Sequence, residues 1–274
     1  EITYGDWSSD VCSSDLLLDA TVGRGTFVRS AAWPDAARTE ATAQGPVDLG
    51  MNLPPIPTDP ALPVLLEQGF ARLLAGPEVA GRLTYRSGAG SGAEKEAGAA
   101  WLRPVLGLVA PERVLVSPGA QPALAALLGC LAARGETVLT DPLTYPGLRG
   151  LAAQLGLRLH AVASDAEGML PEALDSACRT AAPRALYIVP TMHNPTAVTM
   201  PAPRRAAIAA VPQRHDLPII EDDAYGMLPA QPLPALASFS AAPVFHVATL
   251  SKVISPALRI AFLVAPDAAW AARL

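Results

Sequence analysis

The chain has 274 residues, of which 51% are hydrophobic and 16% are charged, enough to bury a large core in one or two domains. Its net charge of −5 gives no reason to expect a nucleic-acid surface from the chain as a whole. The longest uncharged apolar run, residues 122–133, is too short to span a bilayer, so we expect neither a membrane segment nor a signal peptide. Three widely spaced cysteines offer neither metal-ligand spacing nor a disulfide framework, which favours a cytoplasmic protein.

The first sixteen residues differ in character from the rest of the chain. Residues 6–16, DWSSDVCSSDL, lack the apolar period of a helix or a strand, and they resemble the in-frame translation of a common short-read sequencing adapter. We therefore exclude residues 1–16 from arguments about fold and function, and we expect the chain to be a fragment. Residues 31–46 are rich in Ala, Pro and Thr without periodicity, which is typical of a linker.

From residue 47 onward, helical and strand patterns alternate. Short apolar runs rich in Val, Leu and Ile predict strands, and amphipathic stretches between them predict helices. This alternation favours an α/β domain with a largely parallel sheet and active residues at the carboxyl ends of its strands. The predicted helices are 62–75, 94–106, 120–134, 146–156, 171–181 and 202–214, and the predicted strands are 113–117, 136–140, 158–163, 185–190, 217–222, 244–249 and 259–265.

Lysine is scarce in this chain, which has eighteen Arg and only two Lys, Lys95 and Lys252. Arginine can replace a surface lysine but not a lysine that acts as an amine nucleophile. Lys252 directly follows the predicted strand 244–249, with hydroxyl side chains beside it and Arg259 seven residues on. Hydroxyls and an arginine beside an amine suit a phosphorylated aldehyde, whereas a solvated surface lysine is the alternative.

Three other predicted strands end in unusual residues. SPGAQPAL, 117–124, runs through a glycine into a helix, where backbone N–H groups and the helix dipole suit a phosphate; taken alone, an ordinary turn fits it better. MHNPTAV, 192–198, places Asn194 before a proline, which by itself indicates a β-turn. IIEDDAYG, 219–226, ends an apolar strand with three acidic residues, and the lack of nearby His or Cys at ligand spacing argues against a metal.

Together these strand ends resemble the signatures of pyridoxal-phosphate (PLP) enzymes of fold type I, specifically the class I/II aminotransferases. The order and spacing over residues 117–259 match S-G-x-Q, D-P-x-Y, N-P-T-G, D-x-x-Y and S-K-x(6)-R. The resemblance implies the fold type I large domain over residues 47–274, a mostly parallel central sheet with helices on both faces. It also implies that this chain stops before the C-terminal small domain and its substrate-binding arginine, so substrate choice cannot be read from it.

The resemblance implies a role for each matching residue around the cofactor ring. Lys252 is the expected Schiff-base lysine and general base. Asp222 is expected to pair with the protonated pyridine nitrogen. Tyr225 and Asn194 are expected to hydrogen-bond the phenolic oxygen of the ring, and Tyr145, in DPLTYPG, is expected to stack on the ring.

The same resemblance implies a phosphate site and a dimer. Tyr85, in LTYRSGAGSG, is similar to the family tyrosine that reaches the phosphate of the neighbouring subunit, so a homodimer is expected. Ala197 departs from the pattern, because the family has Gly after N-P-T; we expect strain there if its φ is positive. The residues expected to hold the phosphate are Ala120, Gln121, Thr249, Ser251 and Arg259.

The front of the chain suggests a regulator. VGRGTFVRS, 22–30, resembles the last β-hairpin wing of a GntR-type winged helix, so residues 17–30 are expected to be a remnant of that domain. A linker followed by an aminotransferase-like domain is the architecture of the MocR subgroup, which VDLGMNLPPIP, 47–57, also resembles. Arg24 is the expected groove-facing wing residue, and DNA contact is expected only through an N-terminal domain absent from this chain.

Three functions therefore remain open. The first is a PLP-dependent transcription regulator whose aminotransferase-like domain transfers or senses an amino group. The second is a metabolic aminotransferase acting on an amino acid or amine plus a 2-oxo acid, and the third is a structural homologue that binds no cofactor. In the first two, we expect the domain to have the chemistry of a PLP-dependent aminotransferase. We expect the fragment itself to be weakly stable and without turnover.

Overall fold

The computed structural model describes residues 18–21, 25–28, 52–54, 61–76, 79–82, 84 and 88–274. The predictions for residues 1–16, for the linker 31–46, and for Arg24 and Tyr85 lie outside these ranges. The chain divides into two units, Glu1–Asn52 and Leu53–Leu274. In the first unit, β1 (Leu18–Thr21) and β2 (Gly25–Val28) pair antiparallel, with Leu18 opposite Val28 and Thr21 opposite Gly25.

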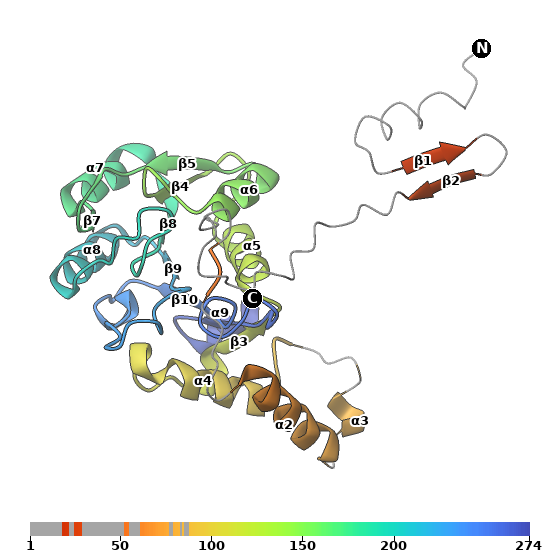
Figure 1. The fold of residues 1–274 in the computed structure, drawn as a ribbon. Coiled ribbons are helices and arrows are strands. Elements are labelled where there is room, and N and C mark those ends of the chain that lie inside the picture. Colours follow the sequence, from red (N-terminus) through yellow and green to blue (C-terminus); the bar gives the residue numbers. More distant parts are fainter. Residues whose placement is uncertain are drawn as a thin grey trace, which may run out of the picture. The chain divides into compact units, whose positions relative to one another are not determined.

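The second unit is built on a seven-stranded sheet that confirms the predicted α/β class (Figure 1). Within it only β11 runs antiparallel to its neighbours, and the strand pairings along β10, β9, β8, β4 and β5 are all parallel. The strand order is β3 (Val114–Ser117), β11 (Ala261–Val264), β10 (Val244–Thr249), β9 (Ile219–Asp222), β8 (Pro183–Ile188), β4 (Thr137–Thr140) and β5 (Arg158–Ala161).

Helices cover both faces of this sheet because alternate residues of each strand point to opposite sides. On one face, Phe245 of β10 packs in a core with α5 (Ala120–Leu131), α6 (Pro146–Leu155) and α9 (Ala268–Arg273). On the other face, Val244 of the same strand packs with other helices, and Figure 1 shows β8 and β9 lying between α8 and α5. The helices of this second face are α7 (Pro171–Ala181), α8 (Ala202–His215) and α4 (Gly92–Leu106).

Most predicted elements are found, and the differences lie mainly at their ends. The predicted helix 171–181 and strand 244–249 match the structure at both ends. Helix α4 begins two residues earlier than predicted, because Ser91 and Glu94 cap its first turn reciprocally. The predicted strand 259–265 begins only at Ala261, because the two residues before it belong to the turn that follows β10.

Several short elements were not predicted. They are the small hairpin of β6 (Ser164–Asp165) and β7 (Gly168–Met169), the helix α3 (Val79–Arg82), the terminal helix α9, and the 3-10 turns η1 (Pro111–Arg113) and η2 (Leu236–Ser238). Each is too short to show an apolar period in the sequence. The predicted helix 62–75 is present as α2 (Leu62–Ala75). Within the described ranges, no helix combines the length and the apolar character needed to cross a membrane.

The topology brings the four motif-bearing strand ends together. Strands β3, β8, β9 and β10 all point the same way, so the segments that follow them meet at one edge of the sheet. Strand β11 runs the opposite way, so the segment that precedes it lies at that edge too. This carboxyl edge therefore receives the motifs of residues 117–259 that resemble the aminotransferase signatures.

Ala197 lies in the turn after β8 with a φ of 60°. This is the positive φ for which backbone strain was expected. A left-handed conformation costs an L-residue roughly 1–2 kcal/mol. We expect Ala197→Gly to raise the free energy of unfolding by about 0.5–1 kcal/mol, because glycine relieves this strain but adds chain entropy to the unfolded state. Urea unfolding measures the change. Ala206→Gly, on the exposed side of α8, is the control and should lower the free energy of unfolding by about 1 kcal/mol; an equal loss in both variants would contradict the strain argument.

Candidate functional site

Ten of the eleven residues expected from the sequence line one pocket at the carboxyl edge of the sheet. The pocket has a volume of about 130 Å³. Val189 and Ala224 complete its lining and were not predicted, because small apolar residues at a strand end carry no distinguishing pattern. The other lysine, Lys95, lies in α4 and does not line this pocket. The ten residues are Ala120, Gln121, Tyr145, Asn194, Asp222, Tyr225, Thr249, Ser251, Lys252 and Arg259.

One end of the pocket is formed by the junction of β3 and α5. Gly119 caps α5 with a φ of 106°, a conformation that side chains rarely adopt. A Cβ built on this glycine would lie 3.7 Å from a guanidinium nitrogen of Arg259. The start of a twelve-residue helix therefore directs its free N–H groups and its positive dipole end to a place that also receives an arginine. Such a cradle suits an anion, and a phosphate in particular.

The turn between β10 and β11 fixes Arg259 and Lys252 relative to each other. Thr249 Oγ1 donates a hydrogen bond to the carbonyl of Ile260 at 3.1 Å, and Ser251 Oγ donates to the carbonyl of Leu258 at 3.1 Å. These bonds hold the two residues on either side of Arg259. The hydroxyls of Thr249 and Ser251 thus position the arginine, in addition to lining the pocket.

Tyr145 forms another wall of the pocket. It precedes α6, and its Oη accepts a hydrogen bond from Gln121 Nε2 at 2.9 Å. Gly147, two residues later, makes this contact possible, because a Cβ there would lie 1.8 Å from Gln121 Nε2 and 2.5 Å from the Tyr145 ring. The glycine of the DPLTYPG stretch is thus a requirement of close packing that the sequence analysis did not identify.

Asp222 brings a buried carboxylate to the pocket at the end of β9. Its side chain is buried, with the residue 5% exposed, and Oδ2 accepts a hydrogen bond of 2.6 Å from Tyr187 Oη. Its other oxygen, Oδ1, is buried and has no hydrogen-bond partner among the described residues. Burial raises the pKa of Asp222 to about 6; the charge of Asp223 also raises it, while the Tyr187 hydrogen bond and His246 lower it. An N–H group placed in the pocket would satisfy Oδ1 and favour the charged form.

A second set of ionisable side chains lies on the face of the sheet opposite to Asp222. Glu221 accepts a hydrogen bond from the Leu236 N–H at 2.7 Å, and its Oε2 lies 3.1 Å from His246 Nδ1. His246 Nε2 lies 3.9 Å from Asp223 Oδ2. Burial lowers the pKa of His246, but the nearby carboxylates, Glu221 first, outweigh it and raise the pKa above its usual value. In the described ranges, no group of three or more His, Cys, Asp or Glu side chains is arranged to hold a metal ion.

This buried histidine affects the charge of Asp222 from the opposite face of the sheet. A protonated His246 lowers the pKa of Asp222 and so favours the carboxylate. His246 was not predicted from the sequence, and Glu221 was noted only as one of three acidic residues at the end of an apolar strand. Strand alternation offered a signal, because Glu221 and Asp223 flank Asp222 and must point to the face opposite to it.

Lys252 lies in the turn directly after β10 and lines the pocket together with Asp222. Partial burial lowers the pKa of its amine, and the positive charge of Arg259 lowers it further. Both effects raise the fraction of neutral amine, which is the nucleophilic and basic form.

The chain is similar to known proteins of two kinds. It is 33% identical over 257 residues to the uncharacterised HTH-type transcriptional regulator YdeF of Bacillus subtilis (strain 168), covering 93% of this chain and 55% of YdeF. It is 34% identical over 167 residues to the 2-aminoadipate transaminase of Thermus thermophilus, covering 58% of this chain and 42% of that enzyme. The chain thus spans about half the length of these curated relatives.

Solved structures and a family model agree with this similarity. LysN, the α-aminoadipate aminotransferase of Thermus thermophilus solved with N-(5'-phosphopyridoxyl)-L-leucine, superposes with a TM-score of 0.69 at 29% identity, covering 81% of this chain and 57% of LysN. The kynurenine aminotransferase of Pyrococcus horikoshii, at 20% identity and a TM-score of 0.71 over 86% of this chain and 64% of that one, shares the fold. The model for aminotransferase class I and II matches residues 48–274. The chain therefore belongs to the class I and II aminotransferase family.

Proposed function

We propose that this chain contains the effector domain of a GntR/MocR-type transcription regulator, which binds pyridoxal 5'-phosphate at Lys252 and transfers or senses the amino group of an amino acid or amine. The observation that carries the proposal is the single pocket that brings Asp222, from the end of β9, together with Lys252 and Arg259, from the turn between β10 and β11. A nucleophilic amine, a buried carboxylate and an anion cradle are the three groups that a phosphorylated pyridine aldehyde requires.

The residues present fit this cofactor. The orphaned Asp222 Oδ1 offers an acceptor for a pyridine N–H, and the α5 start with Arg259 offers the phosphate cradle. When bound, pyridoxal phosphate supplies an aldehyde that takes up amines and a ring that stores electrons. Ala120, Gln121, Thr249 and Ser251 would surround the phosphate, Tyr145 would stack on the ring, and Asn194 and Tyr225 would hydrogen-bond its oxygen.

The chain's own groups are suited to moving a proton. The lowered pKa of Lys252 raises the fraction of neutral amine, the form that can accept a proton from a bound amino acid. Asp222, with a pKa of about 6, is mostly ionised at pH 7 and can hold a positive charge on a ring nitrogen. The Tyr187 hydrogen bond keeps that carboxylate in place, and both Tyr187 and His246 lower its pKa and so favour the charged form.

The regulator part of the proposal is supported by the front of the chain. The match to YdeF covers 93% of this chain, so it cannot be contained in residues 48–274, which are 227 of the 274 residues. The matches to enzymes named as transaminases are shorter. In addition, β1 and β2 pair antiparallel where the sequence resembles a winged-helix wing. In this proposal DNA is bound by a domain that precedes the wing, and Tyr85 of each subunit serves the site of the other in a homodimer.

A free-standing metabolic aminotransferase of amino acids and 2-oxo acids is the second candidate, since the 2-aminoadipate transaminase is 34% identical over the matched region. The coding sequence upstream of β1 in the source genome separates the two. For the regulator we expect it to encode a helix-turn-helix domain continuous with residues 17–30. An upstream sequence that encodes no helix-turn-helix would reject the regulator and leave the metabolic enzyme.

Lys252 should carry the cofactor covalently. After reconstitution with pyridoxal phosphate and borohydride reduction, peptide mapping should find the pyridoxyl group on the peptide that contains Lys252. Lys252→Ala should lose both this label and the visible absorbance of the lysine-bound cofactor. Lys95→Ala is the matched control, because it removes the only other lysine, and it should keep both. A label found on Lys95 instead would refute the assignment.

Asp222→Asn should weaken cofactor binding and stabilise the cofactor-free protein. At pH 7 the parent, freed of cofactor, buries a charge at Asp222, so the variant should be more stable by about 2–3 kcal/mol in urea unfolding. Because the native pKa of about 6 is above the unfolded value, the native parent binds a proton as the pH falls from about 6 to 4 and gains stability. The difference should therefore shrink toward pH 4.

Asp216→Asn, at the left-handed end of α8, is the control and should change stability little, because the residue is exposed. With cofactor present, Asp222→Asn should release it more readily than the parent, because an amide does not hold a positive charge on the ring nitrogen. Unchanged cofactor retention together with unchanged stability would show that Asp222 has neither role.

A further inference from the structure

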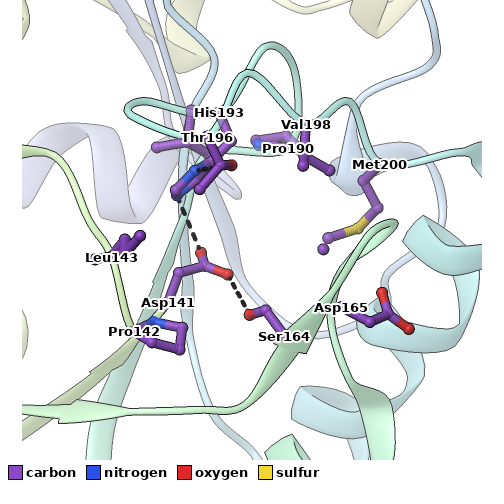
Figure 2. Close-up of a pocket in the computed structure, with 12 residues that line it drawn as sticks. Asp141, Pro142, Leu143, Ser164, Asp165, Pro190, His193, Thr196, Val198 and Met200 are labelled. Atoms are coloured by element: carbon purple, nitrogen blue, oxygen red, sulfur yellow. Dashed lines mark hydrogen bonds and ion pairs between the residues drawn. The ribbon is translucent and has the colours of Figure 1, made fainter.

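A second cavity lies beside the cofactor pocket at the same edge of the sheet (Figure 2). Its volume is about 270 Å³, and it is formed by the segments that follow β4, β5 and β8. It shares Val189 with the cofactor pocket, and His193 in its wall directly precedes Asn194 in the wall of the other. Lys252 and Arg259 do not line it, so its chemistry is separate from that of the proposed function.

Two buried polar side chains face each other in this cavity. Asp141, 7% exposed, accepts a hydrogen bond from Ser164 Oγ at 2.9 Å through Oδ1. Its Oδ2 lies 3.6 Å from His193 Nε2, which is too long for a hydrogen bond. His193 is 6% exposed, with Nδ1 held 2.8 Å from Thr196 Oγ1, and its Nε2 is buried without a hydrogen-bond partner among the described residues. Figure 2 shows the imidazole pointing toward Asp141 across the cavity.

This pair leaves room for one more polar group. When His193 Nδ1 donates to Thr196, Nε2 carries a lone pair that faces a carboxylate oxygen. Burial lowers the pKa of His193, which favours this neutral form, and burial raises the pKa of Asp141. A donor placed between Asp141 Oδ2 and His193 Nε2 would satisfy both atoms.

The charge around the cavity favours a cationic donor. Asp165 also lines it, but Arg204 binds that carboxylate at 2.9 Å. In the part of the chain that the structure describes, Asp141 has no such cation, and its ion-pair partner is the histidine alone. None of the described residues that line the cavity is Lys or Arg. A buried carboxylate in such a setting is stabilised by a bound cation.

The rest of the lining is apolar. Leu143, Val189, Pro190, Val198 and Met200 form the walls, and Figure 2 shows Met200 reaching toward the cavity opposite the Asp141 and His193 pair. Met200 is buried, whereas Leu143 is exposed. An apolar wall of this size fits a small hydrocarbon body.

We propose that this cavity is a binding site for a small primary amine, whose ammonium group bridges Asp141 and His193 and whose alkyl body packs on Val198 and Met200. The site is distinct from Lys252 and forms no covalent bond with its ligand. Because His193 and Asn194 are consecutive, an amine bound here is coupled to the cofactor pocket through one short backbone segment.

The test is a calorimetric titration with isopentylamine hydrochloride, and with isopentyl alcohol and isovalerate as neutral and anionic probes of the same shape. The protein is first treated with pyridoxal phosphate and borohydride, so that no aldehyde remains to react with the amine. We expect the amine to bind at least tenfold more tightly than either other probe. Asp141→Asn should weaken amine binding at least tenfold, whereas Asp216→Asn, which removes an exposed carboxylate, should leave it unchanged.

A second measurement follows binding in the unmutated protein and uses a variant only to assign one signal. The chain has four histidines, and with ¹⁵N-labelled histidine, saturating isopentylamine should shift the side-chain signal that is missing in His193→Gln. Equal binding of amine and alcohol, no binding of the amine, or a His193 signal that does not move would each overturn the proposal. If Lys252 took up no pyridoxyl label, the proposed function would fail while this titration would still decide the second site.

Discussion

A buried carboxylate at the end of β9 is the constraint around which the site is organised. Asp222 sits in a setting that disfavours its charge, and the pocket function we propose needs that charge. Tyr187 donates a short hydrogen bond to Oδ2, which offsets part of the cost of burying the charge. The remaining oxygen has no hydrogen-bond partner among the described residues, and in the function we propose it accepts from the ring nitrogen of the cofactor. Binding and stability therefore pull in opposite directions at this one side chain.

The sheet separates two layers of charge that act on each other. Asp222 points into the pocket, while Glu221 and Asp223 point to the other face, where His246 lies against them. In the parallel register Glu221 pairs with His246, so β9 and β10 deliver these groups side by side. When His246 is protonated, its positive charge acts on Asp222 from the other face of the sheet and lowers the pKa of that carboxyl group. Residues that touch nothing in the pocket thus help to set its electrostatics.

Much of the site could be predicted from the sequence, because segments that follow parallel strands lie close together at one edge of the sheet. The resemblance to the aminotransferases named the ten lining residues. Topology explains why they meet, because their motifs adjoin predicted strands and strands that run the same way end at the same edge. The Tyr187 contact with Asp222 was not predictable in this way, because Tyr187 lies inside a strand and has the pattern of a core residue. Nor was the pairing of Asp141 with His193, which joins the loops after two different strands. The φ of Ala197 is likewise a property of the folded loop.

The loop after β8 links the two pockets, and it holds its shape through a buried arginine. Met192 and Ala197 both adopt left-handed backbone conformations, with φ values of 45° and 60°, and between them lie His193 of one cavity and Asn194 of the other. Arg205 is fully buried and donates to the carbonyls of Pro190 and Met200, one on each side of this loop.

Its guanidinium also donates to Thr191 Oγ1 at 2.9 Å. Strained backbone persists only where the surroundings over-determine it, and a planar group with five donors on α8 supplies that rigidity. Because Arg205 binds both ends of this loop, the positions of His193 in one pocket and of Asn194 in the other depend on the same buried guanidinium.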